Sequence, residues 1–518
     1  MHQKQTHGYV ACNTPSHTPY PPPYSPLSTP HSPLHRAMST LELQDIQGII
    51  VRGYSNLEAA CFVLLSIQNA IATRNWLGSL ADRLQNGHDR PSETCLNLAF
   101  TYDGLKALGL DQTTLETFST EFREGMTQPY KSRVLGDHGD NAPVLWDWGG
   151  GVHSPPIHIL LMVYATDEVT LTSFYDGLAE SFGSGGVALI RKLDTFMLKD
   201  EQGGFREHFG FRDAIGQPIV EGLSKAGAPD NTVKAGEFIL GYPNEYGLFT
   251  ESPTVSAERD RQNLLPAGQK GAEAHDLGRN GSYVVFRQLG QKVQDFWQFL
   301  DGITQQADGT SNPEARVQLA SKLVGRWPSG TPLVEAPDRD RSDVKDKNAF
   351  AYYHADPHGF KCPMGAHIRR SNPRDSLDPQ PGTQTSIAIN KTHRLLRRGR
   401  TYGTPVADSL NPQDMLQAEA SGERGLHFIC IGANIARQFE FVQQTWINNP
   451  KFNGLYSETD PLVGDRAPGG VGVAADFTEQ AQPVRKRVTG LPNFVVVRGG
   501  AYFFLPSICA CRYLASLS

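Results

Sequence analysis

The residues with the clearest chemical potential in this sequence lie in one short segment, Lys361 to Arg374. The segment holds a single imidazole, His367, and three guanidinium groups, those of Arg369, Arg370 and Arg374. Because prolines and a glycine surround the histidine, we expect a bent segment and not a regular helix or strand. A neutral imidazole can bind a transition metal, and arginine can hold an anionic group through two parallel hydrogen bonds.

Haem is a cofactor that needs both kinds of residue, since its iron takes an axial ligand and its two carboxylates favour nearby cations. The alternative is a basic surface loop in which His367 binds no metal. A loop of that kind, with the basic residues from Arg369 to Arg400, would bind anions or RNA, and the protein would show no haem absorbance. Taken alone, the segment fits a basic surface loop better than a haem site. Features elsewhere in the chain are needed to distinguish the two.

The composition limits the classes of protein to which the chain can belong. Its 518 residues, 39% of them hydrophobic, are enough for two or more domains. The net charge of −6 gives no reason to expect nucleic acid as a partner. No apolar run approaches the roughly 18 residues of a membrane span, so we expect no membrane partner. The oligomeric state is left open.

The seven cysteines are scattered, and none forms a C-x-x-C pair. A bound haem should therefore be held non-covalently. Residues 1–37 are rich in Pro, Ser, Thr and His and lack the apolar stretch of a signal peptide, so we expect a disordered tail there. Together these features favour a reduced, cytoplasmic location.

Alternation of strand-like and helix-like patterns after the tail predicts an α+β fold. In the first half, apolar runs at 59–67 and 156–166 predict strands, helical spacing follows at 170–182, and residues 46–53 also look like a strand. The second half repeats the mixture, with strands expected at 281–287 and 425–431 and helices at 293–304 and 435–446.

A second chemical candidate, Asp213, ends the run from Arg206 to Asp213 and precedes Gly216-Gln-Pro218. Aromatic residues come just before it and would shield it from water. An aspartate in a turn commonly has a structural role, bonding the backbone two residues further on. A carboxylate shielded in this way can also transfer protons to and from a substrate.

Four stretches together resemble the dye-decolorizing peroxidases, in the longer branch of fungal and bacterial enzymes, and the resemblance covers roughly residues 41 to 510. They are His208-Phe-Gly-Phe-Arg-Asp213 with Gly216-Gln-Pro218, Gly365-Ala-His-Ile-Arg-Arg-Ser-Asn-Pro-Arg374, Leu395-Leu-Arg-Arg-Gly-Arg-Thr-Tyr-Gly403 and Gly499-Gly-Ala-Tyr-Phe-Phe-Leu-Pro506. One departure is Ala214, which stands where the family motif has glycine. If that position needs a positive φ, alanine costs about 1 kcal/mol there.

The resemblance implies two ferredoxin-like domains with antiparallel sheets, an N-terminal one at 38–240 and a C-terminal one at 241–518. The second would bind one non-covalent haem b per chain. By motif match His367 is the iron ligand, Asp213 and Arg397 are the catalytic residues of the peroxide side, and Arg374 binds a haem propionate. Leu426 and Phe428 would narrow the peroxide pocket, and Asp460 would accept a hydrogen bond from the iron-bound imidazole.

The implied function is that of a peroxidase, in which hydrogen peroxide is the oxidant and dyes, phenols or other aromatic compounds are oxidised in one-electron steps. Bulky dyes cannot enter a pocket sized for peroxide, so Tyr402 and Trp446 are possible electron relays to the surface, or else ordinary packed aromatic residues. The alternative function is that of a haem-binding or iron-releasing protein with minor peroxidase activity. Such a protein would bind haem through the same residues but react slowly with peroxide.

Overall fold

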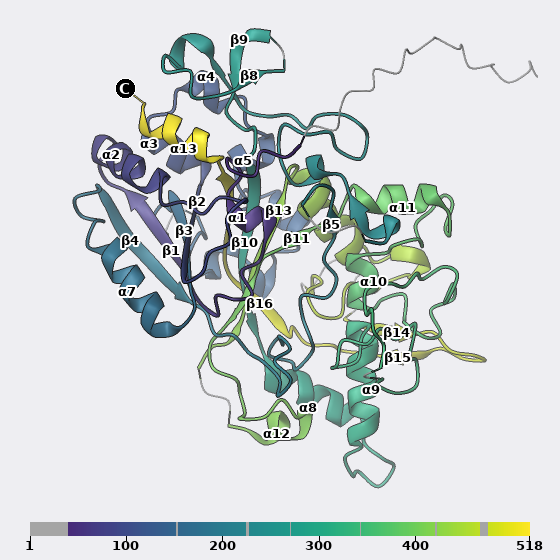
Figure 1. Ribbon diagram of the computed structural model, residues 1–518. Coiled ribbons are helices and arrows are strands. Elements are labelled where there is room, and N and C mark those ends of the chain that lie inside the picture. Colours follow the sequence, from purple (N-terminus) through teal and green to yellow (C-terminus); the bar gives the residue numbers. More distant parts are fainter. Residues whose placement is uncertain are drawn as a thin grey trace, which may run out of the picture. The chain divides into compact units, whose positions relative to one another are not determined.

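Figure 1 shows the computed structural model of the chain. It describes residues 40–517, except 152–153, 224–226, 270, 342, 420–421 and 467–474. The tail predicted at residues 1–37 lies outside the described residues, so the prediction of disorder stays untested there.

The centre of the described chain is a nine-stranded antiparallel sheet. Its strand order is β11-β13-β10-β16-β2-β3-β1-β4, and β12 pairs beside β11 with β13. One residue pair, Phe504 with Phe100, joins β16 to β2 and so connects strands from the two halves of the chain. The strands are β1 (Ala59–Ile67), β2 (Thr94–Phe100), β3 (Ile159–Ala165), β4 (Val187–Asp194), β10 (Ser282–Gln291), β11 (Leu396–Arg397), β12 (Arg400–Tyr402), β13 (Gly425–Gly432) and β16 (Val495–Leu505).

The central strands are almost continuously apolar because both faces of the sheet are covered. Along β1, Cys61 and Val63 pack into one core, while Phe62 and Leu64 pack into the other. The first core contains the helices α2 (Ala70–Ala81), α3 (Tyr102–Leu108), α7 (Glu168–Ala179) and α13 (Ile508–Ala515). The second core is closed mainly by irregular segments around residues 46–57 and 233–242.

The helix α13 and the turn before it pack against residues from the start of the described chain. The side chain of Gln47 donates a hydrogen bond to the carbonyl of Pro506 at 2.8 Å, and the backbone N–H of Ile508 donates to the carbonyl of Asp45 at 2.9 Å. Cys509 N–H donates to the Asp45 carboxylate at 2.7 Å. A segment near residue 508 therefore completes the packing of the first half of the sheet.

A further group of helices lies beside the half of the sheet formed by β10, β13 and β16 (Figure 1). In α8 (Val293–Thr304) the buried residues Val293, Phe296, Trp297 and Leu300 recur at helical spacing and pack against α9 (Pro313–Val324). Next to them are α10 (His367–Ser371), α11 (Gln384–Lys391) and α12 (Pro412–Gln417). After β13 the chain forms two consecutive π-helical segments, Ala436–Glu440 and Val442–Ile447.

The predicted α+β class with antiparallel strands is confirmed, and so are the predicted strands at 59–67 and 425–431 and the helix at 293–304. The strand predicted at 46–53 is wrong, because Gly48–Val51 form the short helix α1. The apolar side chains Ile49 and Ile50 are buried there by packing under the sheet, a pattern that a strand would share. Residues 367–371, expected to be irregular, form one helical turn.

The remaining elements are short. Small sheets pair β5 (Ile219–Val220) with β6 (Thr232–Val233), β7 (Thr254–Ser256) and β8 (Ala267–Gly268) with β9 (Gly271–Asp276), and β14 (Phe477–Glu479) with β15 (Lys486–Val488). Short helices are α4 (Gln112–Leu115), α5 (Thr120–Glu124), α6 (Lys131–Leu135), η1 (Gly139–Asn141), η2 (Pro143–Leu145), η3 (Pro229–Asn231), η4 (Ala235–Glu237), η5 (Ala257–Arg259) and η8 (Phe452–Gly454). Among the described residues, no helix is both long and apolar enough to cross a bilayer.

Candidate active site

A cavity of about 300 Å³ lies between the sheet and the helical segments beside it. Its volume falls at the lower end of the roughly 300–1,000 Å³ range of cofactor and small-molecule sites. The sheet supplies one wall, and α9, α10 and the π-helical segments supply others. The apolar lining includes Leu289, Val324, Phe350, Leu426, Phe428, Phe439, Val442, Ile447, Leu462, Val495 and Val497.

His367, the first residue of α10, borders the cavity and keeps 30% of its side-chain surface accessible there. Its ring Nδ1 lies 2.9 Å from Oδ2 of Asp460, a carboxylate with no exposed surface. The other carboxylate oxygen of Asp460 accepts the backbone N–H groups of Leu462 and Val463. Asp460 is thereby fixed in position, and its bond to Nδ1 leaves ring atom Nε2 as the nitrogen available to a ligand.

The electrostatics of this pair follow from burial and from opposite charge. Burial lowers the pKa of His367, but the charge and hydrogen bond of Asp460 outweigh it, so the pKa is raised. For Asp460, burial raises the pKa and the imidazole and backbone N–H groups lower it, with a net decrease. The carboxylate is therefore held ionised beside the ring, where it increases the electron density of the imidazole.

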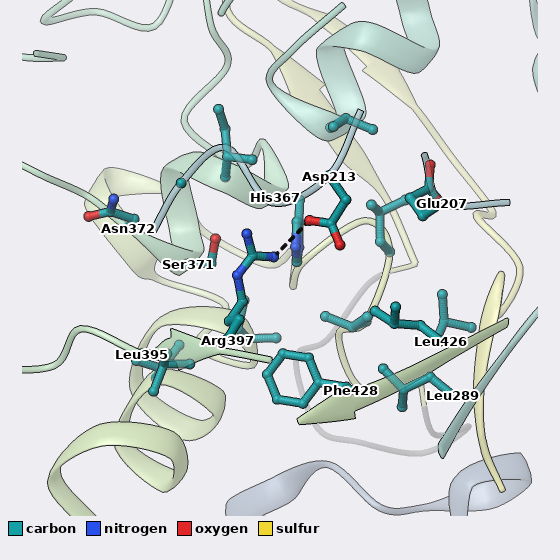
Figure 2. A pocket seen from close by; sticks show the side chains of 18 of the residues that line it. Glu207, Asp213, Leu289, His367, Ser371, Asn372, Leu395, Arg397, Leu426 and Phe428 are labelled. Atoms are coloured by element: carbon teal, nitrogen blue, oxygen red, sulfur yellow. Dashed lines mark hydrogen bonds and ion pairs between the residues drawn. The ribbon is translucent and has the colours of Figure 1, made fainter. Parts of the chain in front are cut away.

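Asp213 and Arg397 come together at the same cavity, although they are far apart in the sequence. Arg397 Nη1 lies 3.2 Å from Asp213 Oδ1, and each side chain is 33% exposed. Figure 2 shows the pair with His367 behind it. The side-chain amide of Gln217 holds the backbone of Arg397 through two hydrogen bonds, of 3.1 and 3.2 Å, and so ties β11 to the loop that carries Asp213.

Ala214 has φ of 65°, in the left-handed region, so the position does require a positive φ. Its backbone N–H donates to Asp213 Oδ1 at 2.6 Å. Because both this bond and the Arg397 contact use Oδ1, Oδ2 forms no hydrogen bond with the residues that the structure describes. The alanine therefore occupies a strained position directly beside the carboxylate.

Leu426 and Phe428 lie two residues apart on β13 and point into the cavity (Figure 2). His427 between them contacts the rings of Phe62 and Phe286, which belong to the opposite core. Arg397 is paired with Cys430 on the same strand, which places its side chain on the face of the sheet that carries Phe428. The sheet therefore aligns the guanidinium with two apolar side chains that restrict the space in front of it.

Arginines that form no ion pair with a carboxylate of the described residues surround one part of the cavity. The guanidinium of Arg374 donates to the carbonyls of Asn348 and Phe350 and stacks 3.7 Å from the ring of Phe350. Burial lowers the pKa of Arg326 to about 10 and that of Arg394 to about 9, and for Arg394 the charges of Arg374 and Arg397 lower it further. Only Arg374 of these three was predicted; nothing in the sequence distinguishes Arg326 from an ordinary surface arginine.

These residues fit a haem. Among the described residues no group of three or more His, Cys, Asp and Glu side chains could hold a metal ion, and His367 is the imidazole that lines the cavity. Buried arginines that lack acidic partners favour an anionic group, and two haem carboxylates would supply it. The apolar lining suits the faces of the ring.

Glu207 also lines the cavity and was missed by sequence reasoning (Figure 2). Its carboxylate accepts backbone N–H groups from Phe209 and Phe211 at 2.9 Å each. Burial raises its pKa to about 7 against the opposing effect of these hydrogen bonds, and the charge of Asp213 raises it further. Its place in the Asp213 stretch was the available signal, but burial of a single glutamate cannot be read from the sequence.

Tyr402 and Trp446, the predicted relay residues, are both largely buried, at 7% and 4% exposure. The ring of Tyr402 stacks on His427 with centroids 4.5 Å apart. Trp446 lies in the second π-helical segment and contacts the rings of His393 and Phe441 at 5.2 and 5.4 Å. Neither residue lines the cavity within the described part of the chain, so a relay role stays a prediction.

Comparison with known proteins gives the class. No family model matches the chain. Two enzymes of Mycetinis scorodonius, Peroxidase 2 and Dye-decolorizing peroxidase msp1, are each 30% identical over 507 and 503 residues, covering 92% of this chain and 88% of each relative. Multifunctional dye peroxidase DyP2 of Amycolatopsis sp. is 29% identical over 380 residues, covering 72% of this chain and 74% of that enzyme.

Solved structures agree. An ancestral D-type dye decolorizing peroxidase matches with a TM-score of 0.73 and 27% identity over 92% of this chain and 99% of that one. A dye-decolorizing peroxidase in complex with 2,6-dimethoxyphenol matches with a TM-score of 0.72 and 26% identity, over 92% and 100%. The α+β fold and the cavity therefore define a haem peroxidase. The chain belongs to the dye-decolorizing peroxidase family, as its motifs predicted, and is an oxidoreductase that uses hydrogen peroxide.

Proposed function

We propose that the chain binds one haem b non-covalently in the cavity beside His367, and uses it to oxidise dyes, phenols and other aromatic compounds in one-electron steps. The observation that carries this proposal is the convergence of three groups on one cavity: the His367–Asp460 pair, the Asp213–Arg397 pair and the arginines that form no ion pair with a described carboxylate. Arg374, Arg394 and Arg326 would hold the haem propionates, and Nε2 of His367 would bind the iron.

Haem, when bound, supplies an iron at which peroxide is reduced and from which oxidising equivalents pass to the substrate. Asp213 would take a proton from hydrogen peroxide at Oδ2, which accepts no hydrogen bond from the described residues, and would return it to the oxygen that leaves as water. Arg397, always cationic, would stabilise the negative charge that develops as the O–O bond lengthens. One carboxylate can therefore serve first as base and then as acid.

The other residues would prepare this step. Asp460 accepts from Nδ1 of His367, which fixes the ring tautomer and makes the imidazole a more electron-rich ligand. Leu426 and Phe428 would exclude water and larger molecules from the space in front of Arg397, and so reserve it for peroxide.

The related proteins and the size of the cavity indicate which reducing substrates the chain would oxidise. One related structure carries 2,6-dimethoxyphenol, and phenols of this kind are proposed as substrates here. Dyes too large for the cavity would react at the surface, with Tyr402 or Trp446 as intermediate electron carriers. Because both are buried, such a relay would pass its electron across a thin layer of protein.

The domain division and the cellular location of the chain are also proposals. We propose a division into an N-terminal ferredoxin-like domain at 38–240 and a C-terminal one at 241–518. It is supported by the strand order, since β4-β1-β3-β2 in the first half has its counterpart in β16-β10-β13 with β11 and β12 in the second.

A cytoplasmic location is likewise proposed, supported by the free thiols of the six described cysteines.

The experiment is an absorption and stopped-flow study of the purified protein loaded with haem. We expect one haem per chain, rapid spectral change with hydrogen peroxide, and turnover of both 2,6-dimethoxyphenol and an anthraquinone dye. Stoichiometric haem with only slow reaction towards peroxide would instead favour a haem-binding or iron-releasing protein. Absence of bound haem after reconstitution would contradict both functions.

A further inference from the structure

Glu207 organises the loop that ends in Asp213. Its backbone N–H donates to the carbonyl of Phe211 at 3.0 Å, and Gly210 N–H donates back to the carbonyl of Glu207 at 2.8 Å. Inside this turn the Glu207 carboxylate accepts the N–H groups of Phe209 and Phe211, one on each oxygen. The loop is therefore closed around the carboxylate of Glu207, six residues before Asp213.

The loop is anchored on both sides of that carboxylate. The rings of Phe209 and Phe211 pack on α8, with Phe209 4.5 Å from Phe296 and Phe211 stacked on Trp297 at 6.5 Å. Asp213 N–H donates to the carbonyl of Phe205 at 3.1 Å. Backbone hydrogen bonds therefore hold the chain on both sides of the turn. The position of Asp213 depends on the shape of this turn, which Glu207 maintains.

Gln291, at the end of β10, supplies the third contact of the carboxylate. Its side-chain amide lies 2.5 Å from Oε2 of Glu207, and Oε1 of Gln291 has no partner among the described residues. A separation of about 2.5 Å is at the short end of the range for O–H···O bonds and below the range for N–H···O bonds. With the amide turned over, Oε1 of Gln291 would accept a proton from a neutral Glu207 and would gain the partner that it lacks.

The charged neighbour that acts on Glu207 is Asp213, and Arg397 faces Asp213 from β11. Arg206 is engaged with Asp200, and Arg287 on β10 is engaged with Asp137. The ring of His208 bonds the carbonyl of Tyr402, and burial lowers its pKa to about 4, so it is neutral near pH 7. The field of Asp213 adds to burial in holding a proton on Glu207.

We propose that Glu207 is a positioning residue for Asp213 that carries an exchangeable proton of its own, shared with Gln291, so that the charge beside Asp213 changes across the neutral pH range. This inference rests on the proton-transfer role proposed for Asp213. Below the transition Glu207 is neutral beside Asp213, and above it Glu207 carries a negative charge. Ionised Glu207 repels the charge on Asp213 and makes Asp213 a stronger proton acceptor.

The test uses the haem-loaded enzyme and the rate constant of its reaction with hydrogen peroxide between pH 5 and pH 8.5. We expect the wild-type rate to rise through an inflection near pH 7, by about two- to tenfold, because one pKa unit corresponds to a factor of ten. In Glu207→Gln the side chain keeps its length but cannot ionise. This variant should retain haem and lose the inflection.

Glu207→Asp separates the two parts of the proposal. The shorter carboxylate still ionises but cannot reach both backbone N–H groups, so the inflection should remain while the rate falls about 10- to 100-fold, since a displacement of about 1 Å can cost 10²-fold. Unchanged rates in Glu207→Asp would overturn the positioning role. An inflection that persists in Glu207→Gln, or is missing from the wild type, would overturn the proton-carrying role.

A matched control is Glu237, a second buried carboxyl whose pKa burial raises to about 7, paired with Arg437 outside the cavity. Glu237→Gln should leave the kinetic inflection unchanged. Infrared difference spectra between pH 5 and pH 8 provide a readout independent of turnover: Glu207→Gln should lose one protonated-carboxyl band and Glu237→Gln another. Two results together would separate this inference from the proposed function. If Glu207→Gln loses its infrared band but Asp213→Asn reacts normally with peroxide, the proposed function is contradicted and the titration of Glu207 still stands.

Discussion

Ala214 donates its backbone N–H to the carboxylate of Asp213 at 2.6 Å while its own φ of 65° lies in the left-handed region. The residue that departs from the family motif is thus both strained and bonded to the side chain that it could displace. A glycine would adopt this conformation without a steric penalty. The strain and the position of the carboxylate are therefore coupled at one peptide unit.

Ala214→Gly should increase the free energy of unfolding by up to about 1 kcal/mol, because relief of the left-handed strain exceeds the extra freedom of glycine in the unfolded chain. It should also raise the rate of reaction with peroxide if the strain pulls the carboxylate from its best position. Denaturant unfolding and stopped-flow spectroscopy measure the two effects. Ala214→Val, with a β-branched side chain, should change stability in the opposite sense.

Asp213→Asn should slow the reaction with hydrogen peroxide by about 10²- to 10⁴-fold, the usual contribution of a positioned acid–base group. The amide keeps the shape of the carboxylate but cannot take the proton. Haem content, read from the absorption spectrum, should stay at the wild-type level. Rates within a factor of a few of wild type would transfer the role to Arg397 or to water.

Removing the imidazole should affect cofactor binding itself. His367→Ala is expected to lose stoichiometric haem or to hold it loosely with an altered spectrum, since His367 is the imidazole that lines the cavity. Titration of the apoprotein with haem measures this directly. Full haem content with an unchanged spectrum would refute the ligand assignment.

Asp460→Asn should keep the haem and shift its properties. The amide still accepts from Nδ1 of His367 but carries no charge, so the imidazole becomes a weaker donor and the reduction potential of the iron should rise. Spectroelectrochemistry of the variant and the wild type gives the comparison. Asp465→Asn is a suitable control, because this carboxylate lies nearby and bonds His138 and not His367.

Two fully buried groups should give opposite pH dependences of stability. Burial lowers the pKa of His427 to about 4, so its contribution is complete above about pH 6.5 and is lost as the pH falls through 4. Burial raises the pKa of Glu237 to about 7, so its contribution is complete below about pH 4.5 and is lost as the pH rises through 7. Between pH 5 and 6 the two effects oppose each other.

The free energy of unfolding of His427→Gln should therefore decrease relative to that of the wild type as the pH rises, by about 1.4 kcal/mol per pH unit, and that of Glu237→Gln should increase by the same amount. Denaturant unfolding at pH 5 and pH 6 measures both slopes. Equal slopes in the wild type and both variants would show that neither buried group titrates as described.

Short motifs predicted much of the site because the family chemistry is concentrated in them. His367, Asp213 and Arg397 each lie in a stretch with several matching neighbours, and all three border one cavity. Asp460 was a weaker prediction, because 93 residues separate it from His367 and their contact depends on the packing of a loop. Arg326, Arg394 and Glu207 were missed, since their importance comes from burial that a single sequence does not reveal. The helix at Gly48–Val51 was misread because packing and not periodicity decides so short an element.

The contacts between residues 504–515 and the first half of the sheet have a consequence for biosynthesis. Gln47, Asp45 and Phe100 all bond or pair with residues that the ribosome adds more than 400 positions later. Until α13 emerges from the ribosome, the first half of the sheet would therefore have an unpaired edge strand and an uncovered core. Chaperone binding to the nascent chain should persist until that point, and capture of haem should come after it.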